Sequence, residues 1–504
     1  MKTRLFISGL LLILLNFSIN INAQTVNNDS IAPKTSLSVT KHSIVINGKQ
    51  INYTATTGTL LLRTDKDESS ALIGFTAYTK DGENPVKRPI TFTYNGGPGS
   101  ASVWLHVGVI GPRRVVVNDP GTNGPAPYTM EDNQYSILDV SDIVLIDPVG
   151  TGFSHAVGKS KNTDFWNVDA DIKSVSQFIR QYITGNERWN SPKFLLGESY
   201  GTFRSAGVAN YLQENYGISA NGVMLLSSVL DIRTIAFQPG DDLSYVLNLP
   251  TYSATAWYHN KLPNKPANLT GFLQEVRDFS SGAYATALLK GDQLPAAERE
   301  SILTRLVAYT GLSRDFLDKA NLRVTEPQFA AELLRDSSEI IGRLDSRYTE
   351  INAHLLSETT GNDPLSTGIM PAYISAFMNY YTTELKGDKD KTYNIFATDP
   401  DFKWDWKHPR SYGLFGTGST ASTSPDLLNA MTSNPKLKVL VMNGLFDLAT
   451  PFYGTEYTFS HLGLSPKLRK NVIFKYYEAW HMVYIHEPSA AIFKKDVADF
   501  ISNN

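Results

Sequence analysis

The chain contains 504 residues, of which 42% are hydrophobic and 19% are charged, so it is long enough to bury a large core and polar enough to remain soluble. Its 46 Lys and Arg residues nearly balance its 49 Asp and Glu residues, which leaves a net charge of −3. No summed field therefore favours binding to nucleic acid or to an anionic membrane surface. We expect the partner to be a peptide or a small molecule.

The first two dozen residues have the pattern of an export signal. Lys2 and Arg4 precede an apolar run at 5–15, and the small residue Ala23 closes the segment. This pattern predicts a signal peptide at 1–23 and a periplasmic or secreted protein of a bacterial type, with no membrane span after signal cleavage. The apolar run is shorter than a helix that crosses a bilayer. The chain has no cysteine, so it forms neither disulfides nor thiolate metal sites.

The next part of the chain has the alternation of β-strands. Apolar and polar residues alternate from 36 to 80, and Asn47 and Gly48 separate two such runs, which predicts a hairpin and an antiparallel N-terminal ribbon. Further along, short and continuously apolar segments are typical of buried parallel strands. These segments cover residues 89–94, 143–146, 194–196, 223–226, 437–442 and 472–476.

Helical patterns replace this rhythm between residues 239 and 434. The predicted helices there cover residues 297–309, 328–344 and 371–385. A helical block between strand and loop patterns indicates an insertion that sits on the sheet as a cap over the site. The predicted core therefore consists of residues 24–238 and 435–504, with a mainly helical cap at 239–434.

A G-x-S-x-G motif marks the candidate nucleophile. The predicted strand at 193–196 leads into residues 197–201 with Ser199 at the centre, and a helical pattern follows at 202–211. Strand, motif and helix together are the context of a nucleophile elbow, whose sharp turn requires both glycines. The alternative is a serine that only caps the following helix. A similar motif at 152–156 lacks the second glycine and a strand directly before it.

Two later strands are followed by the candidate acid and base. Asp447 comes after the strand at 437–442, and His481 comes after the strand at 472–476, which is the order in which acid and base follow the serine in α/β hydrolases. The alternatives are a turn-forming role for Asp447 and a surface role for His481. His486 is a rival base, but it lies further along its segment.

These elements predict an α/β-hydrolase fold, with a mostly parallel central sheet, an antiparallel N-terminal ribbon and an inserted helical cap. In the predicted mechanism His481 takes the proton of Ser199 as the serine oxygen attacks a carbonyl carbon. Asp447 holds the imidazole in the required tautomer and stabilises its charged form. Water then releases the acyl-enzyme.

A glycine-rich loop follows the predicted strand at 89–94. Residues 95–102 read Asn-Gly-Gly-Pro-Gly-Ser-Ala-Ser, and such a loop after an early strand supplies backbone N–H groups to a tetrahedral oxygen. Phosphate binding is the competing interpretation. It is disfavoured because no Gly-Lys-Ser/Thr follows and because Pro98 removes a donor.

Four blocks in order resemble the serine carboxypeptidase family. They are the Asn-Gly-Gly-Pro-Gly at 95–99, the Asp-Pro-Val-Gly-Thr-Gly-Phe-Ser at 147–154, the elbow at 197–201 and the His-Met-Val at 481–483. The resemblance extends from about residue 91 to 484. It implies a serine-type carboxypeptidase that releases C-terminal amino acids from peptides through an acyl-enzyme, with no cofactor.

The resemblance also implies roles for the residues around the serine. The backbone N–H groups of Gly97 and Tyr200 would form the oxyanion hole. Asn95, the N–H of Gly96 and Glu198 would hold the terminal carboxylate of the substrate. Glu198 does so only when it is protonated, because two anions at hydrogen-bond distance repel each other.

The chain departs from the family at several positions. Residues 106–112 contain no acid where members of the family usually place a second glutamate before a Gly-Pro pair. We hypothesise that Arg113 or Arg114 binds the carboxylate instead, the alternative being two solvated arginines. Trp480 replaces a small residue before the histidine, and Ser100 replaces a common cysteine.

Two other functions compete with a carboxypeptidase. A serine esterase or acyltransferase would use the same triad without gripping a carboxylate, and a non-catalytic binding protein would use only the fold. The intact Ser, Asp and His set argues against the second. No metal site is predicted, since the sequence contains no HExxH or comparable ligand cluster.

Overall fold

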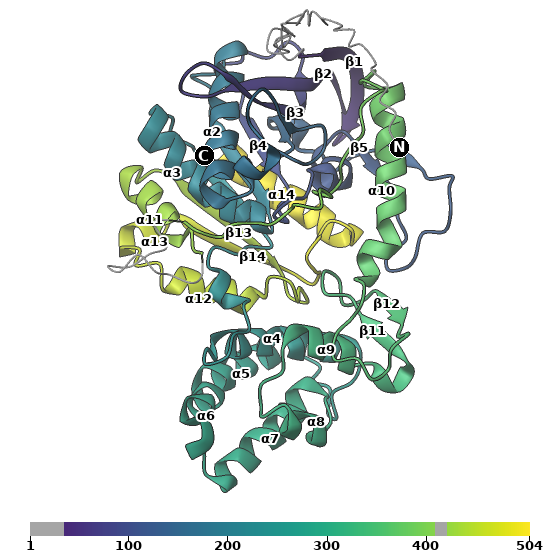
Figure 1. Cartoon of the computed structure of the whole chain (residues 1–504), viewed down its shortest axis with the longest axis vertical. Helices are drawn as coiled ribbons and strands as arrows, with labels where there is room; N and C mark the ends of the chain where they lie inside the picture. The colour runs from purple at the N-terminus through teal and green to yellow at the C-terminus, as the bar shows by residue number, and fades with distance from the viewer. Residues whose placement is uncertain (1–34, 409–420) are drawn as a thin grey trace, which may run out of the picture.

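The computed structural model describes residues 35–408 and 421–504, so the signal peptide predicted at 1–23 lies outside the described residues. The strands of the central sheet are β1 (Leu37–Ile46), β2 (Lys49–Arg63), β3 (Ser69–Lys80), β4 (Ile90–Tyr94), β7 (Asp142–Ile146), β8 (His155–Ala156), β9 (Lys193–Glu198), β10 (Gly222–Leu226), β13 (Lys438–Gly444) and β14 (Val472–Tyr477). Their order is β1-β2-β3-β7-β4-β9-β10-β13-β14, with β8 paired to β3 (Figure 1).

The sheet changes from antiparallel to parallel pairing at β7. Neighbours from β1 to β7 are antiparallel, whereas all pairs from β7 to β14 are parallel. Asn47 and Gly48 form the predicted hairpin turn and both have positive φ. Each predicted parallel strand falls on an observed strand within two residues at either end. The α/β-hydrolase fold predicted from the sequence is therefore confirmed.

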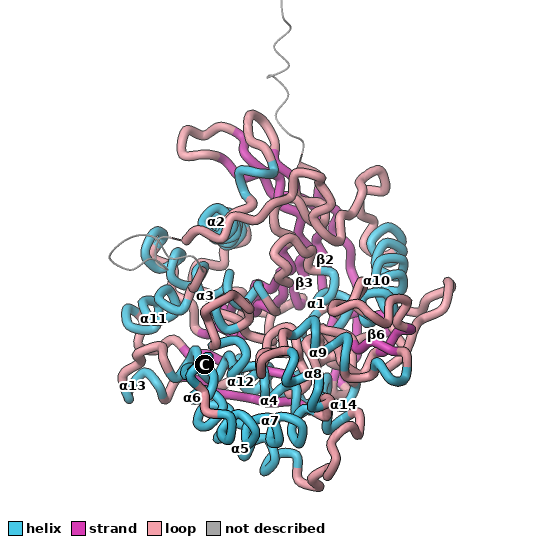
Figure 2. The backbone as a smooth tube through the Cα atoms, turned by 60° about the horizontal axis from the view of Figure 1, so that its bottom comes forward, coloured by secondary structure: helices cyan, strands magenta, loops and turns pink. Residues whose placement is uncertain are grey.

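Helices cover both faces of the sheet, which explains why the parallel strands are apolar throughout. In β9, Leu195 faces one core, which contains residues of α2 (Val168–Gly185), α3 (Tyr200–Tyr216) and α11 (Ser424–Ser433). Its neighbours Phe194 and Leu196 face the other core, which contains residues of α14 (Glu487–Ser502) and α10 (Pro364–Thr383). Figure 2 shows α2, α3 and α11 grouped on one flank and α10 on the opposite flank.

The segment between β10 and β13 contains most of the remaining helices. They are α4 (Leu243–Tyr258), α5 (Leu269–Phe279), α6 (Ala285–Lys290), α7 (Ala296–Thr310), α8 (Arg314–Lys319) and α9 (Glu326–Glu332). In Figure 1 these helices form a lobe apart from the sheet. The limits 239–434 for a cap stay a prediction. Within them, α11 packs against α3 of the core rather than against this lobe.

Two predicted helices have different limits in the structure. The helix expected at 328–344 ends at Glu332, and the short strand β11 (Glu339–Ile341) follows and pairs with β12 (Thr349–Ile351). Ser338, with a φ of 59°, turns the chain between them. The helix expected at 371–385 begins earlier, because Asp363 caps it and Pro364 occupies its first turn, where proline is tolerated. The remaining elements are α1 (Val103–Leu105), β5 (Arg113–Val115), β6 (Met130–Asp132), α12 (Phe452–Ser460) and α13 (Pro466–Arg469).

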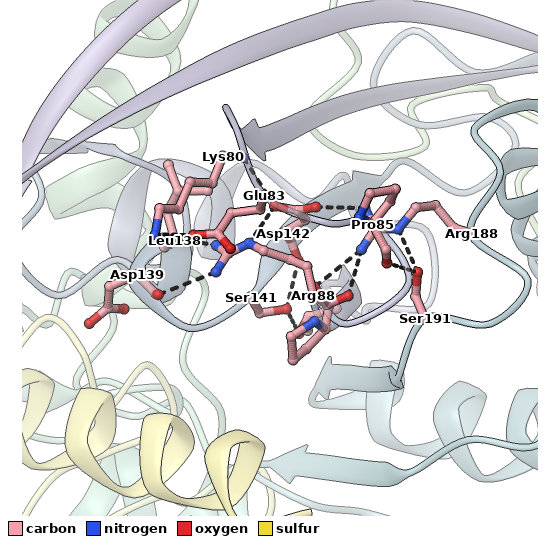
Figure 3. A network of polar contacts seen from close by, with 12 residues as sticks. Lys80, Glu83, Pro85, Arg88, Leu138, Asp139, Ser141, Asp142, Arg188 and Ser191 are labelled. Carbon is pink, nitrogen blue, oxygen red and sulfur yellow. Dashed lines mark hydrogen bonds and ion pairs between the residues drawn. The ribbon is translucent and has the colours of Figure 1, made fainter.

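A buried carboxylate joins the starts of three neighbouring parallel strands (Figure 3). Asp142, the first residue of β7, accepts hydrogen bonds from Arg88 Nε at 2.9 Å and from Arg188 Nη1 at 2.6 Å. Arg88 precedes β4, and Arg188 precedes β9 and bonds to Ser191 Oγ at 2.6 Å. All three charged side chains are at most 6% exposed. The network therefore aligns the strands whose opposite ends carry the candidate site.

We predict that Asp142→Asn destabilises the protein by about 3–5 kcal/mol, because it leaves two buried guanidinium groups without their carboxylate. The measurement is the free energy of unfolding in urea. Asp315→Asn, which changes an exposed ion pair with Lys319, is the matched control and should unfold at the wild-type urea concentration. Equal midpoints for the two variants would contradict the assignment of the network.

Candidate active site

Ser199 occupies a sharp turn between β9 and α3. Its φ of 60° and ψ of −130° are unusual for a residue with a side chain, and its N–H donates to the carbonyl oxygen of Leu226 at 2.9 Å. A Cβ atom on Gly197 would lie only 2.0 Å from the carbonyl oxygen of Gly201. The turn is therefore possible only with glycine at that position, and it holds the serine at the end of a central strand.

The glycine-rich loop lies against the first turn of α3. A Cβ atom on Gly96 would lie 2.4 Å from the backbone nitrogen of Tyr200 and 2.6 Å from that of Gly201. As the first residue of α3, Tyr200 has no intrahelical acceptor for its N–H. Among the described residues, the Gly97 N–H also has no acceptor. Two donors therefore remain available near Ser199.

Asp447 and His481 meet where β13 and β14 end. The Nδ1 atom of His481 lies 2.8 Å from Oδ2 of Asp447. The buried carboxylate also accepts hydrogen bonds from the N–H groups of Ala449 and Thr450 at 2.8 and 3.0 Å and from the Thr450 hydroxyl at 2.6 Å. These bonds fix the carboxylate toward the imidazole. The rival base His486 lies outside the pair, at the N-cap of α14.

Neighbouring charges favour a proton on His481. Burial lowers the pKa of this imidazole, but the carboxylates of Asp447 and Glu198 together raise it above its ordinary value. A base that holds its proton in this way is stabilised in the imidazolium form that appears after proton transfer.

Ser199 and His481 line the same cavity. Within the described residues the Ser199 hydroxyl makes no hydrogen bond, so the structure joins acid and base but leaves the serine unpaired. Such contacts often tighten only when substrate binds. Ser154, in the similar motif at 152–156, has a different environment. Its hydroxyl is buried, donates to the Asp147 carbonyl at 2.6 Å and accepts from the Gly74 N–H.

A buried carboxyl group stands beside the serine. Oε2 of Glu198 accepts hydrogen bonds from Asn95 Nδ2 at 3.0 Å and from the Tyr484 hydroxyl at 2.9 Å. Burial raises the pKa of Glu198 to about 7, against the lowering effects of His481, Tyr484 and Asn95. The group is therefore largely protonated in mildly acidic solution. Sequence analysis missed Tyr484, although it lies only three residues beyond His481.

The cavity that contains these groups has a volume of about 220 Å³ and lies between the core and the segment that follows the helical lobe. Apolar side chains form much of its wall. They are Trp104, Leu344, Leu365, Ile369, Phe396 and Met482. The polar lining residues are Asn95, Ser100, Glu198, Ser199, Arg343, Ser366 and His481, together with Gly96 and Gly97.

The hypothesis that Arg113 or Arg114 binds a substrate carboxylate is wrong. Arg113 pairs with Asp132 at 2.7 Å and with Glu384 at 3.3 Å, and Arg114 pairs with Glu131 at 2.8 Å. Both belong to β5 and lie outside the cavity lining.

The segment that carries no acid at 106–112 is also buried. His106 bonds to the Tyr78 hydroxyl at 2.6 Å, and burial lowers the pKa of this imidazole to about 3, so His106 is neutral. The segment therefore contributes packing rather than a second charged group.

Trp480 connects the histidine loop to the segment after the helical lobe. Its indole Nε1 donates to Ser346 Oγ at 3.0 Å, and the Arg347 guanidinium carbon lies 3.7 Å from the centroid of its ring system. The N–H of His481 donates to the Leu344 carbonyl at 3.0 Å. Residues 344–347 thus hold the backbone that presents the imidazole, and this contact was not predicted from the sequence.

Two negative findings apply to residues 35–408 and 421–504. None of the helices in that part combines the length and the apolar character that a membrane crossing requires. The same residues contain no group of three or more His, Cys, Asp or Glu side chains arranged to hold a metal ion.

Comparison with known proteins gives one family. Residues 50–224 match the family model described as serine carboxypeptidase. Serine carboxypeptidase-like 25 of Arabidopsis thaliana is 22% identical over 406 residues, which is 77% of this chain and 73% of that protein. Serine carboxypeptidase-like 20 of the same plant is 34% identical over 123 residues, so the match spans only 23% of its length.

Solved structures with low sequence identity also match. A proline iminopeptidase from Mycobacterium smegmatis is 14% identical, with a TM-score of 0.38, and the match covers 88% of this chain and 98% of that one. The strand order described above carries the fold assignment. With the match of residues 50–224 and the curated relatives, it shows that the chain is a hydrolase of the α/β-hydrolase type that is similar to serine carboxypeptidases.

Proposed function

We propose that this chain is a serine-type carboxypeptidase that releases C-terminal amino acids from peptides, with Ser199, His481 and Asp447 as the catalytic triad. One observation carries the proposal. The buried, protonatable carboxyl of Glu198 lines the same cavity as Ser199 and His481. In a carboxypeptidase such a group would share its proton with the terminal carboxylate of the substrate.

The proposed reaction begins when Ser199 Oγ attacks the last peptide carbonyl carbon and His481 Nε2 accepts the serine proton. Asp447 stabilises the resulting imidazolium. The tetrahedral oxygen accepts hydrogen bonds from the N–H groups of Gly97 and Tyr200. The C–N bond then breaks, His481 returns the proton to the leaving amine, and water hydrolyses the acyl-enzyme by the same route in reverse.

The terminal carboxylate would be held by Asn95, the Gly96 N–H and Glu198. Oε2 of Glu198 already accepts two hydrogen bonds, so Oε1 is the oxygen left to share a proton with the substrate. This contact is favourable only while Glu198 is protonated, because an ionised Glu198 repels another carboxylate.

A serine esterase or acyltransferase is the second candidate. The segment at 106–112 lacks an acid, so the binding site for a carboxylate contains one carboxyl group rather than two.

We also propose export to the periplasm or to the medium, on the pattern of residues 1–23. Protease protection of the mature protein in intact cells would test this.

The first prediction from the proposed function concerns the triad. Asp447→Asn should lower kcat about 10⁴-fold, because His481 then adopts the wrong tautomer. The kcat values are measured from the release of the C-terminal residue of an N-blocked dipeptide.

A fluorophosphonate probe should label the wild type and Ser301→Ala, whose serine is exposed on α7, but not Ser199→Ala. Labelling of Ser199→Ala would contradict the assignment of the nucleophile.

The second prediction separates the two candidate functions. A carboxypeptidase should cleave an N-blocked dipeptide with a free terminal carboxylate faster than the same dipeptide with a terminal amide, since the amide loses a charge-assisted hydrogen bond worth about 1.5–3 kcal/mol. Chromatographic measurement of kcat/KM for both compounds checks it. Equal values would exclude the carboxypeptidase and leave the esterase.

The third prediction concerns pH. With the pKa of Glu198 at about 7, kcat/KM on free-carboxylate peptides should fall as the pH rises through 7 and Glu198 ionises. Glu198→Gln, which cannot ionise, should lose this decline. Protonation of His481 should lower activity of both proteins at acidic pH. If wild type and variant show the same alkaline decline, Glu198 is not the titrating group.

A further inference from the structure

Arg343, whose side chain carries a guanidinium group, lines the catalytic cavity together with Glu198, Ser199 and His481. We propose that Arg343 binds a carboxylate of the substrate and is a specificity-determining residue. The carboxylate is either the C-terminal one or that of an acidic side chain. This inference rests on the proposed function and deepens it, because it assigns a cationic subsite to a cavity whose other walls are largely apolar.

The position of Arg343 is fixed relative to the reacting groups. The N–H groups of Arg343 and Leu344 donate to Oδ2 of Asp363 at 2.8 and 3.0 Å. The Leu344 carbonyl in turn accepts the N–H of His481 at 3.0 Å. The backbone that carries the guanidinium is therefore bonded directly to the backbone that carries the imidazole, and a substrate attacked by Ser199 lies within the reach of one arginine side chain.

The guanidinium of Arg343 has N–H donors that are available to a ligand. Its contact with an acid is between Nε and Oε2 of Glu326, at 3.4 Å. Among the described residues, no hydrogen bond involves its two terminal nitrogens. The side chain is 48% exposed, so this end of the arginine is open to a ligand. Two parallel N–H groups form the fork that recognises a carboxylate in a bidentate manner.

Glu326 leaves the charge of Arg343 largely uncompensated in mildly acidic solution. Glu326 is 7% exposed, and burial raises the pKa of its carboxyl group to about 7, although Arg343 itself acts to lower it. Below that pH the group is mostly neutral. Arg343 then lacks an ionised partner at Glu326, which favours the binding of an anionic ligand.

The other charged groups considered above do not provide a cation for a carboxylate in the cavity. Arg113 and Arg114 form ion pairs with acids outside the cavity, and Glu198 is a proton donor rather than a cation. Around Arg343 the wall includes Leu344, Leu365 and Ile369. A carboxylate bound there is the polar anchor of an otherwise apolar ligand, so we expect peptides that combine apolar residues with one suitably placed carboxylate.

Three N-blocked substrates distinguish the two sources of the carboxylate. The first is a nitrophenyl ester of an apolar amino acid, which has no carboxylate. The second is the corresponding ester of glutamate, which has only a side-chain carboxylate. The third is a dipeptide of two apolar residues, which has only a terminal carboxylate. Each is assayed with wild type, Arg343→Gln, Arg343→Lys and Arg314→Gln, a control arginine with nearly the same side-chain exposure, 51%.

We expect Arg343→Gln to lower kcat/KM about tenfold on a carboxylate-bearing substrate, with Arg343→Lys intermediate and Arg314→Gln unchanged. The apolar ester should be unaffected by all variants. A loss confined to the glutamyl ester assigns the side chain as the ligand, and a loss confined to the dipeptide assigns the terminal carboxylate. No loss on either, or an equal loss on all three substrates, overturns the inference.

A binding measurement without turnover tests the role of Arg343 independently of the proposed carboxypeptidase activity. Calorimetry of the blocked dipeptide and of blocked glutamyl amide is carried out in the Ser199→Ala background, with and without Arg343→Gln. Weaker binding of either ligand in the double variant supports a role for Arg343 even if the wild type cleaves no peptide. Unchanged binding of both ligands overturns the role even if the carboxypeptidase activity is present.

Discussion

The site depends on the close approach of two backbone segments, the loop at 95–99 and the turn that carries Ser199. At Gly96 and at Gly201 the backbone of the opposite segment occupies the space where a Cβ atom would lie. Each residue there must be glycine, or the segments separate. Their separation would remove both N–H donors from the serine at once, because one donor comes from the loop and the other from the first turn of α3.

The remaining parts of the site are joined through a segment that follows the helical lobe. Residues 343–347 bond to the histidine loop through Leu344 and Ser346, and Arg347 packs over the Trp480 ring. Trp480 is larger than the residue that the family resemblance implies at this position. The structure gives a reason for its size, because the indole spans the space between the histidine loop and this segment. The same segment carries Arg343 into the cavity.

Burial sets the ionisation of the carboxyl groups in and around the cavity. It raises the pKa values of Glu198 and Glu326 to about 7, because neither group has a cation in close and complete contact. Asp447 instead accepts three hydrogen bonds from Ala449 and Thr450 and faces His481. Similar side chains thus have different roles. Two exchange protons near neutrality, and the third orients an imidazole.

Local patterns along the chain predict the sheet, the elbow and the order of acid and base. Buried parallel strands need apolar residues on both faces, as Phe194 and Leu195 illustrate, and a sharp turn around Ser199 needs glycine. Such requirements act on neighbouring residues and can therefore be recognised in the sequence. The helix expected at 328–344 ends at Glu332, because the pairing of β11 with β12 overrides the local pattern beyond it.

The distant residues that complete the cavity are recognised only in the folded protein. Tyr484 bonds to Glu198 across 286 positions of the chain, and Arg343 enters from a segment with no motif. Sequence reasoning chose Arg113 and Arg114 because they follow the place of the missing acid, but their partners Asp132 and Glu131 come from the pairing of β5 with β6. Side-chain direction and ion-pair choice depend on which elements meet in space, and no local pattern records that.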